Sequence, residues 1–332
     1  RRFRFEIEEL DSHNQKTQRR RGVIMRYHKV ILTATVLSFW AAGQVLGQGC
    51  SDAGVCSVGI MSGEAFSKED PKKSVVGARY ALGQGDDSTV INTLSLEGQY
   101  AFTPKTFVQL NVPFLMTDGN LGKTSGIGDL LLTVNQLLKQ SGKHQFEGFA
   151  GIRIATGTAD QDEGGQPLPM VYQTSLGTTD LMVGFKWFFS GWSASLAYQQ
   201  PVVQDNQNQF LYSAWPGNPN VSEYAESREL ERAGDIVARV DKAIPIKDFT
   251  LTLGLLPIYH IQNDTYKNDA DQRVSIDGSQ GLTLNVTGGL DYQVTDALSA
   301  NVFLGAPIVT RDVQPDGLAR NFVGGLGVFY NF

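Results

Sequence analysis

The sequence predicts an all-β fold: a transmembrane antiparallel up-and-down β-barrel of about 12 strands, with short periplasmic turns and longer extracellular loops. Three observations predict it. Apolar and polar residues alternate along most of the chain after residue 73, turn residues separate the alternating segments, and the last segment ends on an aromatic residue, Phe332. In a membrane barrel every second side chain of a strand faces lipid and the others face the interior, which produces such alternation.

The composition favours membrane strands over membrane helices. Charged residues make up 19% of the 332 residues, aromatic residues make up 10%, and glycine occurs 36 times. The mean hydropathy of −0.17 is too polar for a helical membrane bundle. A net charge of −6 argues against a nucleic-acid partner, because Lys and Arg contacts to phosphate supply most of the affinity for nucleic acid.

Two segments at the start of the chain are interpreted as lying outside the mature protein. Residues 1–24 carry no fold signal and precede a plausible start methionine, Met25, so we interpret them as an unstructured upstream over-extension of the reading frame. Residues 25–47 combine a short basic region, an apolar run and small residues, which is the pattern of a secretory signal peptide. A single membrane anchor is the competing interpretation, but the run falls short of the ~20 apolar residues that a spanning helix needs.

Residues 48–73 are expected to form a periplasmic N-terminal segment, long enough to act as a small plug inside the barrel. The segment contains both cysteines of the chain, Cys50 and Cys56. An exported protein meets an oxidising compartment, so the two cysteines can form a small disulfide loop. Acylation of Cys50 is the alternative, although the residues just before it lack the apolar residue usual in lipoproteins. No metal is expected here, since no histidine lies nearby to complete a ligand set.

The barrel is expected over residues 74–332, and its first four strands follow in order. Val76, Tyr80 and Leu82 share one face of the first strand and Arg79 lies on the other. Leu131 and Leu137 blur the alternation of the fourth. These four strands are expected at residues 74–83, 89–102, 106–115 and 126–138.

The middle four strands surround a two-residue turn. Ser190 and Gly191 are typical of a tight hairpin turn. Trp187 and Trp192 flank this turn, as expected of the aromatic girdle at a membrane interface. The four strands are expected at residues 145–156, 176–189, 192–203 and 235–243.

The last four strands end in the segment that closes the barrel. They are expected at residues 249–261, 282–292, 298–310 and 321–332. We expect the last to pair with residues 74–83, with Gly325 and Gly327 leaving room on its inner face. Its terminal Phe332 resembles that of closing strands in bacterial outer-membrane barrels, where this residue is the signal that the barrel assembly machinery recognises.

Connection lengths alternate, which fixes the expected topology. Short turns are assigned to the periplasmic side, at residues 103–105, 140–143, 190–191, 244–248 and 295–297. Mostly longer loops are assigned to the outside, at residues 83–88, 116–125, 157–173, 204–231, 263–279 and 311–320. Four outward-running strands carry a proline toward their outer part, and since proline removes a ladder donor, bulges or the upper rim are expected at Pro113, Pro201, Pro257 and Pro307.

Charged and amide residues on the inner faces form the expected lumen lining and solute path. An Arg or Lys at the lipid midplane costs ~2 to 4 kcal/mol, so these residues are expected to point inward. Opposite charges on neighbouring strands of a narrow barrel are expected to pair, whereas unpaired charges would line a water-filled conduit. The expected set is Arg79, Glu97, Gln99, Asp129, Asn135, Glu147, Arg153, Asp180, Lys186, Arg239, Asp241, His260 and Asp291.

No signature of catalysis or metal binding accompanies this set. His144 and His260 are the only histidines after the signal peptide, and neither belongs to a zinc-binding pair or stands beside a nucleophile. The acidic segment 160–165 departs from the EF-hand pattern and is interpreted as a solvated loop. We therefore expect no catalytic residue, no metal and no cofactor, and an enzyme is the least favoured class.

Four short segments together resemble a known family. They are Val112-Pro-Phe114, Gly126-Ile-Gly-Asp-Leu-Leu-Leu132, Gly151-Ile-Arg-Ile-Ala-Thr-Gly157 and Gly177-Thr-Thr-Asp-Leu-Met-Val-Gly-Phe185. The outer-membrane transporter family labelled "MetA-pathway of phenol degradation" is similar, with recurring Gly-x-Gly-Asp strand starts and Pro-Thr-Gly strand ends. Ala155 replaces the proline of the second motif. The resemblance implies uptake of small, often aromatic or hydrophobic compounds across the outer membrane of a Gram-negative bacterium.

The sequence thus predicts an outer-membrane channel or transporter that takes up small organic solutes passively through the barrel lumen. The alternative is a structural or adhesive outer-membrane protein with a filled lumen, whose loop 204–231 meets an external partner. The expected partners are outer-membrane lipid, the barrel assembly machinery and a small organic solute.

Overall fold

The computed structural model describes residues 74–85, 87 and 89–332. The expected signal peptide, plug segment and cysteines Cys50 and Cys56 lie outside the described residues. Within the described part, strands dominate, and the helices are three short 3-10 segments, Met170–Tyr172, Tyr212–Ala214 and Pro219–Glu223. None of these described helices is long and apolar enough to cross a membrane.

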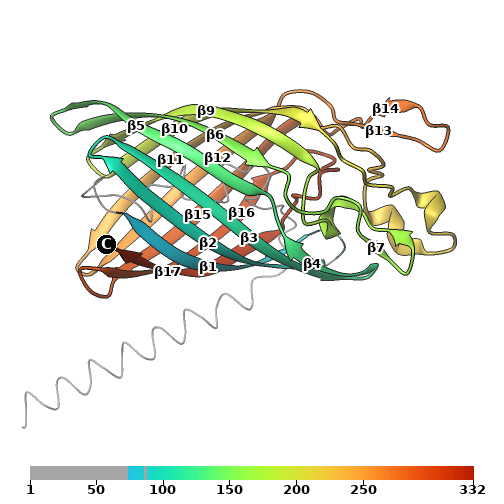
Figure 1. Ribbon diagram of the computed structural model, residues 1–332, viewed down its shortest axis with the longest axis horizontal. Coiled ribbons are helices and arrows are strands. Elements are labelled where there is room, and N and C mark those ends of the chain that lie inside the picture. Colours follow the sequence, from blue (N-terminus) through green and yellow to red (C-terminus); the bar gives the residue numbers. More distant parts are fainter. Residues whose placement is uncertain (1–73, 86, 88) are drawn as a thin grey trace, which may run out of the picture. The chain divides into compact units, whose positions relative to one another are not determined.

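Twelve strands form one closed antiparallel barrel (Figure 1). They are β1 (Val75–Gln84), β2 (Val90–Thr103), β3 (Thr106–Gly119), β5 (Leu130–Ser141), β6 (His144–Ile154), β9 (Thr178–Phe189), β10 (Trp192–Gln204), β11 (Asp235–Ile246), β12 (Phe249–His260), β15 (Gly281–Gln293), β16 (Leu298–Val309) and β17 (Phe322–Asn331). Neighbours around the barrel follow the order of the chain, and β1 pairs with β17, with Val75 opposite Asn331. The predicted fold and its predicted closure are confirmed.

The region after β3 differs from the prediction. Residues 116–125 form no loop, because β3 runs on to Gly119 and pairs with β4 (Gly122–Ile127) in a hairpin. The single strand expected at residues 126–138 is also wrong at its start, because the chain leaves the ladder at Gly128, whose amide donates to the carbonyl of Pro113. At this point β3 exchanges one partner, β5, for the other, β4.

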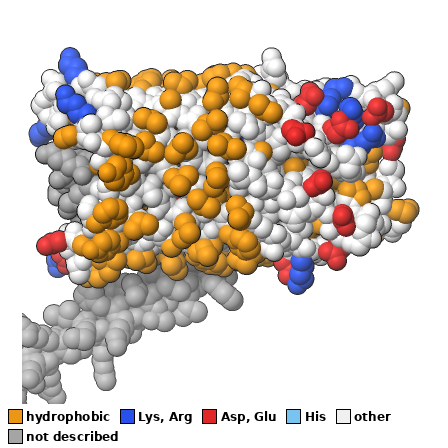
Figure 2. All heavy atoms as spheres, viewed as in Figure 1, with side chains coloured by type: hydrophobic (Ala, Val, Ile, Leu, Met, Phe, Trp, Pro, Cys, Tyr) orange, Lys and Arg blue, Asp and Glu red, His pale blue; other side chains and the backbone are white. Residues whose placement is uncertain are grey.

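The outer surface of the barrel is apolar, as the alternation predicts. Leu96 is 59% exposed on β2, and Val183 is 58% exposed on β9, whereas the inward neighbours Glu97 and Met182 are 2% and 3% exposed. Figure 2 shows apolar side chains spread along the visible face and acidic and basic side chains gathered mainly at the end with the long loops. An apolar band between charged ends is the surface of a membrane-spanning barrel.

Short turns and long loops occupy opposite ends of the barrel. The turn end holds the C-terminus, and the loop end carries β7 (Asp162–Glu163), β8 (Gln166–Pro167), β13 (Thr265–Lys267) and β14 (Arg273–Ser275) (Figure 1). Ser190 and Gly191 have φ values of +47° and +78°, which is the left-handed backbone of a two-residue hairpin turn. Beside this turn, Trp192 is 48% exposed and Trp187 is half-buried on the outer face, at the expected position of the girdle.

The four prolines coincide with breaks in the ladder. The register between β9 and β10 shifts just after Pro201, and that between β15 and β16 shifts beside Pro307. Pro257 falls in a gap in the pairing of β11 and β12, and Pro113 lies where β3 exchanges partners. Each proline therefore stands where the ladder does not need its missing donor.

Candidate functional site

The barrel interior has two unlike sides. On one side, which we call the filled side, apolar side chains from β5, β6, β9, β10, β11 and β12 pack into a buried cluster. Its members are Leu131, Phe149, Met182, Ala197, Val237, Leu256 and Ile258. Leu131, which blurs the alternation of its strand, is 3% exposed because it belongs to this cluster. The sequence analysis missed the cluster, since it treated inward positions as polar.

On the other side, which we call the hollow side, a cavity of about 240 Å³ remains. Most of the strand residues in its walls belong to β1, β2, β3, β16 and β17, with Ala81, Thr93, Asn111, Phe303 and Val323 among them. Where the two sides adjoin, Leu131 of the packed cluster, Arg153 of β6 and Arg239 of β11 also line the cavity. Two segments from the loop end also line the cavity, residues 170–176 and 316–320. We call these two segments the roof.

Arg79 is the charged residue of β1 that lines this cavity. Its Nε donates to Glu97 Oε1 at 2.8 Å, and its Nη1 donates to Asn301 Oδ1 at 3.5 Å. The guanidinium carbon lies 5.0 Å from the ring centre of Phe303 and 5.3 Å from that of Phe329. Two aromatic contacts and a carboxylate thus hold the guanidinium in place.

The other expected lumen charges are also buried and paired. Arg153 forms an ion pair with Asp180, and the Arg239 Nε lies 2.8 Å from Asp241 Oδ2. Lys186 Nζ donates to Asn135 Oδ1 at 3.1 Å, and Glu147 stands opposite Lys186 in the ladder between β6 and β9. The pairing expected from the sequence is what the structure contains, and two of the paired arginines, Arg153 and Arg239, also line the cavity.

The remaining expected residues divide between the lumen and the loop end. Gln99 is buried and accepts a hydrogen bond from Gln109 at 3.3 Å, and Asp291 is half-buried on β15. Asp129 lies outside any strand, and its two carboxylate oxygens accept the backbone amides of Thr156 and Leu176 at 3.3 Å and 3.2 Å. This aspartate therefore ties the chain before the roof to the barrel rim. Whether any of these residues contacts a solute stays a prediction.

A buried ionic network fixes the roof to the barrel, and the sequence analysis missed most of it. Asp316 is 0% exposed and lies 3.1 Å from Arg232 Nη2 and 3.5 Å from Arg311 Nη2. Burial alone would raise the pKa of Asp316, but the charges of Arg232 and Arg311 outweigh burial and hold the pKa of this carboxyl below its usual range. Arg232 also reaches Asp235 at 3.5 Å. No periodic signal connects these residues, because Arg232 lies just before β11, whereas Arg311 and Asp316 lie in the loop between β16 and β17.

His260, an expected lumen residue, belongs to the same network. Its Nδ1 lies 2.7 Å from Asp235 Oδ1, and its Nε2 lies 2.8 Å from Asp264 Oδ1. An ionised carboxylate only accepts hydrogen bonds, so a ring that donates to two carboxylates carries a proton on both nitrogens. His260 therefore acts as a cation that joins β11 and β12 to the loop that follows.

Apolar packing adds a second layer to the roof. Tyr172, Phe210, Trp215 and Tyr224 belong to one buried cluster at the loop end, and the hydroxyl oxygens of Tyr172 and Tyr224 lie 3.2 Å apart. Burial raises the pKa of Tyr224 well above its ordinary value. Gly317 has a φ of +66°, and a Cβ there would lie 2.2 Å from the backbone nitrogen of Val171. Only glycine allows the two roof segments to approach this closely.

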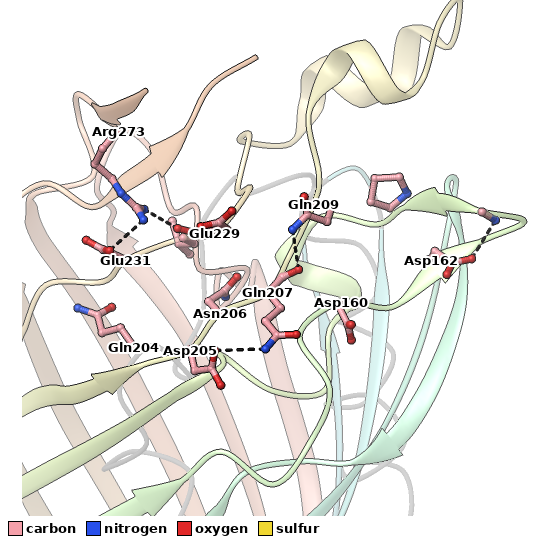
Figure 3. Close-up of a pocket in the computed structure, with 13 residues that line it drawn as sticks. Asp160, Asp162, Gln204, Asp205, Asn206, Gln207, Gln209, Glu229, Glu231 and Arg273 are labelled. Carbon is pink, nitrogen blue, oxygen red and sulfur yellow. Dashed lines mark hydrogen bonds and ion pairs between the residues drawn. The ribbon is translucent and has the colours of Figure 1, made fainter. Parts of the chain in front are cut away.

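A second, larger pocket of about 610 Å³ lies among the loops, and Figure 3 shows its lining. Its side chains are mostly carboxylates and amides, including Asp160, Asp205 and Glu229. Arg273 is paired there with Glu231 at 2.9 Å. Among the described residues, no group of three or more His, Cys, Asp or Glu side chains could hold a metal ion.

No family model matches the chain, and no curated protein matches it. Among solved structures, an outer membrane channel from Pseudomonas putida F1 is similar with 16% identity and a TM-score of 0.59, over 80% of this chain and 98% of that chain. The NanC porin has 11% identity and a TM-score of 0.46, over 77% and 100% of the two chains. The CymD monoaromatic hydrocarbon channel has 10% identity and a TM-score of 0.41, over 88% and 99%. The first likeness shows the fold alone: this chain is built as a closed, up-and-down β-barrel like that of the Pseudomonas putida outer membrane channel.

Proposed function

We propose that this chain is an outer-membrane channel for passive uptake of small organic solutes, and that the solute path follows the hollow side of the barrel. The observation that carries the proposal is the cavity of about 240 Å³ inside a closed barrel whose outer surface is apolar. A barrel that served only as a scaffold has no need of a cavity on one side and dense packing on the other. Close packing is the ordinary state of a protein interior.

The lining of the cavity supports small organic solutes as the cargo. Its walls mix apolar side chains, such as Ile91, Leu115 and Phe303, with hydroxyl and guanidinium groups. Cavities with apolar walls and a few polar groups are typical sites for small organic molecules. The resemblance to a family of transporters for aromatic and hydrophobic compounds agrees with this cargo. The similar Pseudomonas putida F1 protein is named as an outer membrane channel, which agrees with the channel role.

Passage requires the roof to move. Residues 170–176 and 316–320 line the cavity at the loop end and narrow it there, and ion pairs of Asp316 hold the second of these segments. Loops of this kind open on the microsecond to second scale, so the closed roof is compatible with slow, gated flux. The channel therefore conducts when the roof loosens.

Liposome swelling tests the proposal. Folded full-length protein, checked by its heat-dependent mobility on a gel, is reconstituted and exposed to small neutral solutes and to small aromatic acids. We expect swelling with solutes that fit the cavity and none with a trisaccharide, which exceeds it. Folded protein that passes no solute and shows no single-channel conductance would contradict the channel function.

The alternative, a structural or adhesive protein, is favoured by a different observation. The roof and the pocket of about 610 Å³ give the loop end a folded surface for contact with a partner. In this case Arg273→Ala, which removes the basic side chain of that pocket, would reduce binding of cells to a surface and leave permeability unchanged. A loss of permeability without loss of adhesion favours the channel.

The location and assembly of the protein are part of the same proposal. An apolar barrel surface suits the outer membrane, and outer-membrane lipid is then its first partner. Phe332 is 66% exposed at the turn end, where the barrel assembly machinery would meet it. If it is the assembly signal, Phe332→Ala will lower the amount of barrel in the outer membrane, while Tyr330→Ala on the same face will lower it less.

A further inference from the structure

We propose that the cavity binds a small organic carboxylate, with its anionic group at Arg79 and its apolar body against the walls. This proposal rests on the proposed channel function and names the chemical class of its solute. It starts from the bonding of the guanidinium. Nε is taken by Glu97 and Nη1 by Asn301, while among the described residues none accepts a hydrogen bond from Nη2. Arg79 therefore has a donor left for a ligand.

The charges around the cavity favour an anion. Of the ionisable side chains that line it, four are arginines and two are aspartates; they are Arg79, Arg153, Arg239, Arg320, Asp129 and Asp316. The carboxylates that pair with three of these arginines, Glu97, Asp180 and Asp241, do not line the cavity. The wall thus presents guanidinium groups, and the carboxylates lie behind them.

The two aspartates of the lining are both occupied. Asp129 accepts two backbone amides, from Thr156 and Leu176. Asp316 accepts from Arg232 through Oδ2 and from the backbone amide of Leu318 through Oδ1. Neither carboxylate is left to bind a cationic or amine ligand, so the cavity is not suited to a positively charged solute.

The size and walls restrict the rest of the ligand. A volume of about 240 Å³ equals the share of roughly eight water molecules in liquid water, which is room for one ring and a carboxylate but not for an oligosaccharide. Phe303, which lies against Arg79, offers an aromatic face at the same place. A single-ring carboxylate can accept a hydrogen bond from the Arg79 guanidinium and stack its ring near Phe303, an arrangement that a neutral alcohol of the same shape satisfies only in part.

Binding of benzoate and of benzyl alcohol to the folded full chain in detergent, measured by calorimetry, tests the proposal. We expect benzoate to bind at least tenfold more tightly than benzyl alcohol, a difference of about 1.4 kcal/mol. Arg79→Gln with Glu97→Gln removes the ion pair as a whole, so that no buried charge is left alone. This double variant should reduce benzoate affinity to that of benzyl alcohol.

A matched control removes a pair on the filled side. Lys186→Gln with Glu147→Gln changes the same kinds of groups away from the cavity, and we expect benzoate affinity to stay within a factor of two. Equal affinity for benzoate and benzyl alcohol, no benzoate binding by the unaltered chain, or unchanged binding in the Arg79 double variant would each overturn the proposal.

One further measurement needs no variant. The reversal potential of the unaltered channel in a salt gradient should show preference for the anion, and cation preference would overturn the proposal.

The outcomes of these experiments also separate the carboxylate proposal from the channel function. Flux of neutral solutes without benzoate preference leaves the channel standing and removes the carboxylate, whereas no flux of any solute removes the channel.

Discussion

The filled side and the hollow side are built from the same alternating strands, yet one is packed and the other encloses a cavity. On β6, β9 and β12 the inward positions hold large apolar residues such as Phe149, Met182 and Leu256. On β1 and β2 the corresponding positions hold Ala81 and Thr93. Small inward side chains on β1 and β2 therefore contribute to the space that stays open on this side.

The seam between β1 and β17 shows that small residues do not always leave space. Gly325 and Gly327 are expected to leave room on the inner face, and in the structure aromatic rings fill that room. A Cβ on Gly325 would lie 2.6 Å from the Phe303 ring, and one on Gly327 would lie 2.7 Å from the Phe329 ring. The glycines make room for these two rings, which in turn hold Arg79.

The largest effect is expected from filling the hollow side. Ala81→Trp places a large side chain in the cavity, and we expect solute flux to fall by roughly tenfold or more, because conduction depends on the width of the path. Ala78→Trp is the matched control, since Ala78 lies on the same strand but is exposed on the outer face. Liposome swelling measures both, and equal flux through the two variants would contradict a path along the hollow side.

Truncation of one aromatic residue on each side sharpens the comparison. Phe149→Ala leaves a void in the packed cluster and should lower the free energy of unfolding by about 3 to 5 kcal/mol, with little change in flux. Phe303→Ala instead widens the cavity and should raise flux. Urea unfolding followed by gel mobility gives the first quantity and swelling gives the second. If Phe149→Ala raised flux more than Phe303→Ala, the assignment of the two sides would be reversed.

Breaking the roof network should affect gating more than the barrel. Asp316→Asn leaves Arg232 and Arg311 without their shared carboxylate, and loss of one partner from a buried ion pair costs about 3 to 5 kcal/mol. We expect faster hydrogen exchange in residues 310–321 and more frequent channel opening, with the exchange of the barrel strands unchanged. Global unfolding of the barrel in this variant would show that the roof is not a separate element.

The smallest effect is expected from pH. The pKa of Asp316 is lowered in the folded protein, so its carboxylate contributes stability that is fully present above the unfolded pKa of about 3.9 and is lost as the pH falls through the lower folded pKa. Hydrogen exchange of residues 310–321, corrected for the intrinsic rate, should therefore stay slow at neutral and mildly acidic pH and rise only in strong acid. Loosening of the roof between pH 5 and 7 would contradict this assignment.

The barrel could be predicted from the sequence because one physical rule, alternation between lipid and interior, acts on every strand. It placed Arg79, Arg153, Lys186 and Arg239 inside, where the structure has them. The roof could not be predicted, since Arg232 precedes β11 and meets the loop that carries Arg311 and Asp316 only through tertiary packing.

The division of the barrel interior into a filled side and a hollow side could not be predicted from the sequence either. Leu131 is an apolar residue at an inward position where the alternation predicts a polar one, and the sequence alone does not show that this departure has a structural cause. Only the contact of Leu131 with partners on other strands, Phe149 and Met182 among them, shows that apolar inward residues gather on one side. A sequence pattern records which face a residue occupies but not which inward residues become neighbours across the barrel.

Cysteine modification during single-channel recording tests the central claim most directly. In a background with Cys50 and Cys56 replaced by serine, Thr93→Cys places a thiol in the hollow side, and Ala197→Cys places one in the filled side. A small thiosulfonate reagent should block current through the Thr93 variant and leave the Ala197 variant unchanged. Block of the Ala197 variant alone, or of neither, would contradict a solute path along the hollow side.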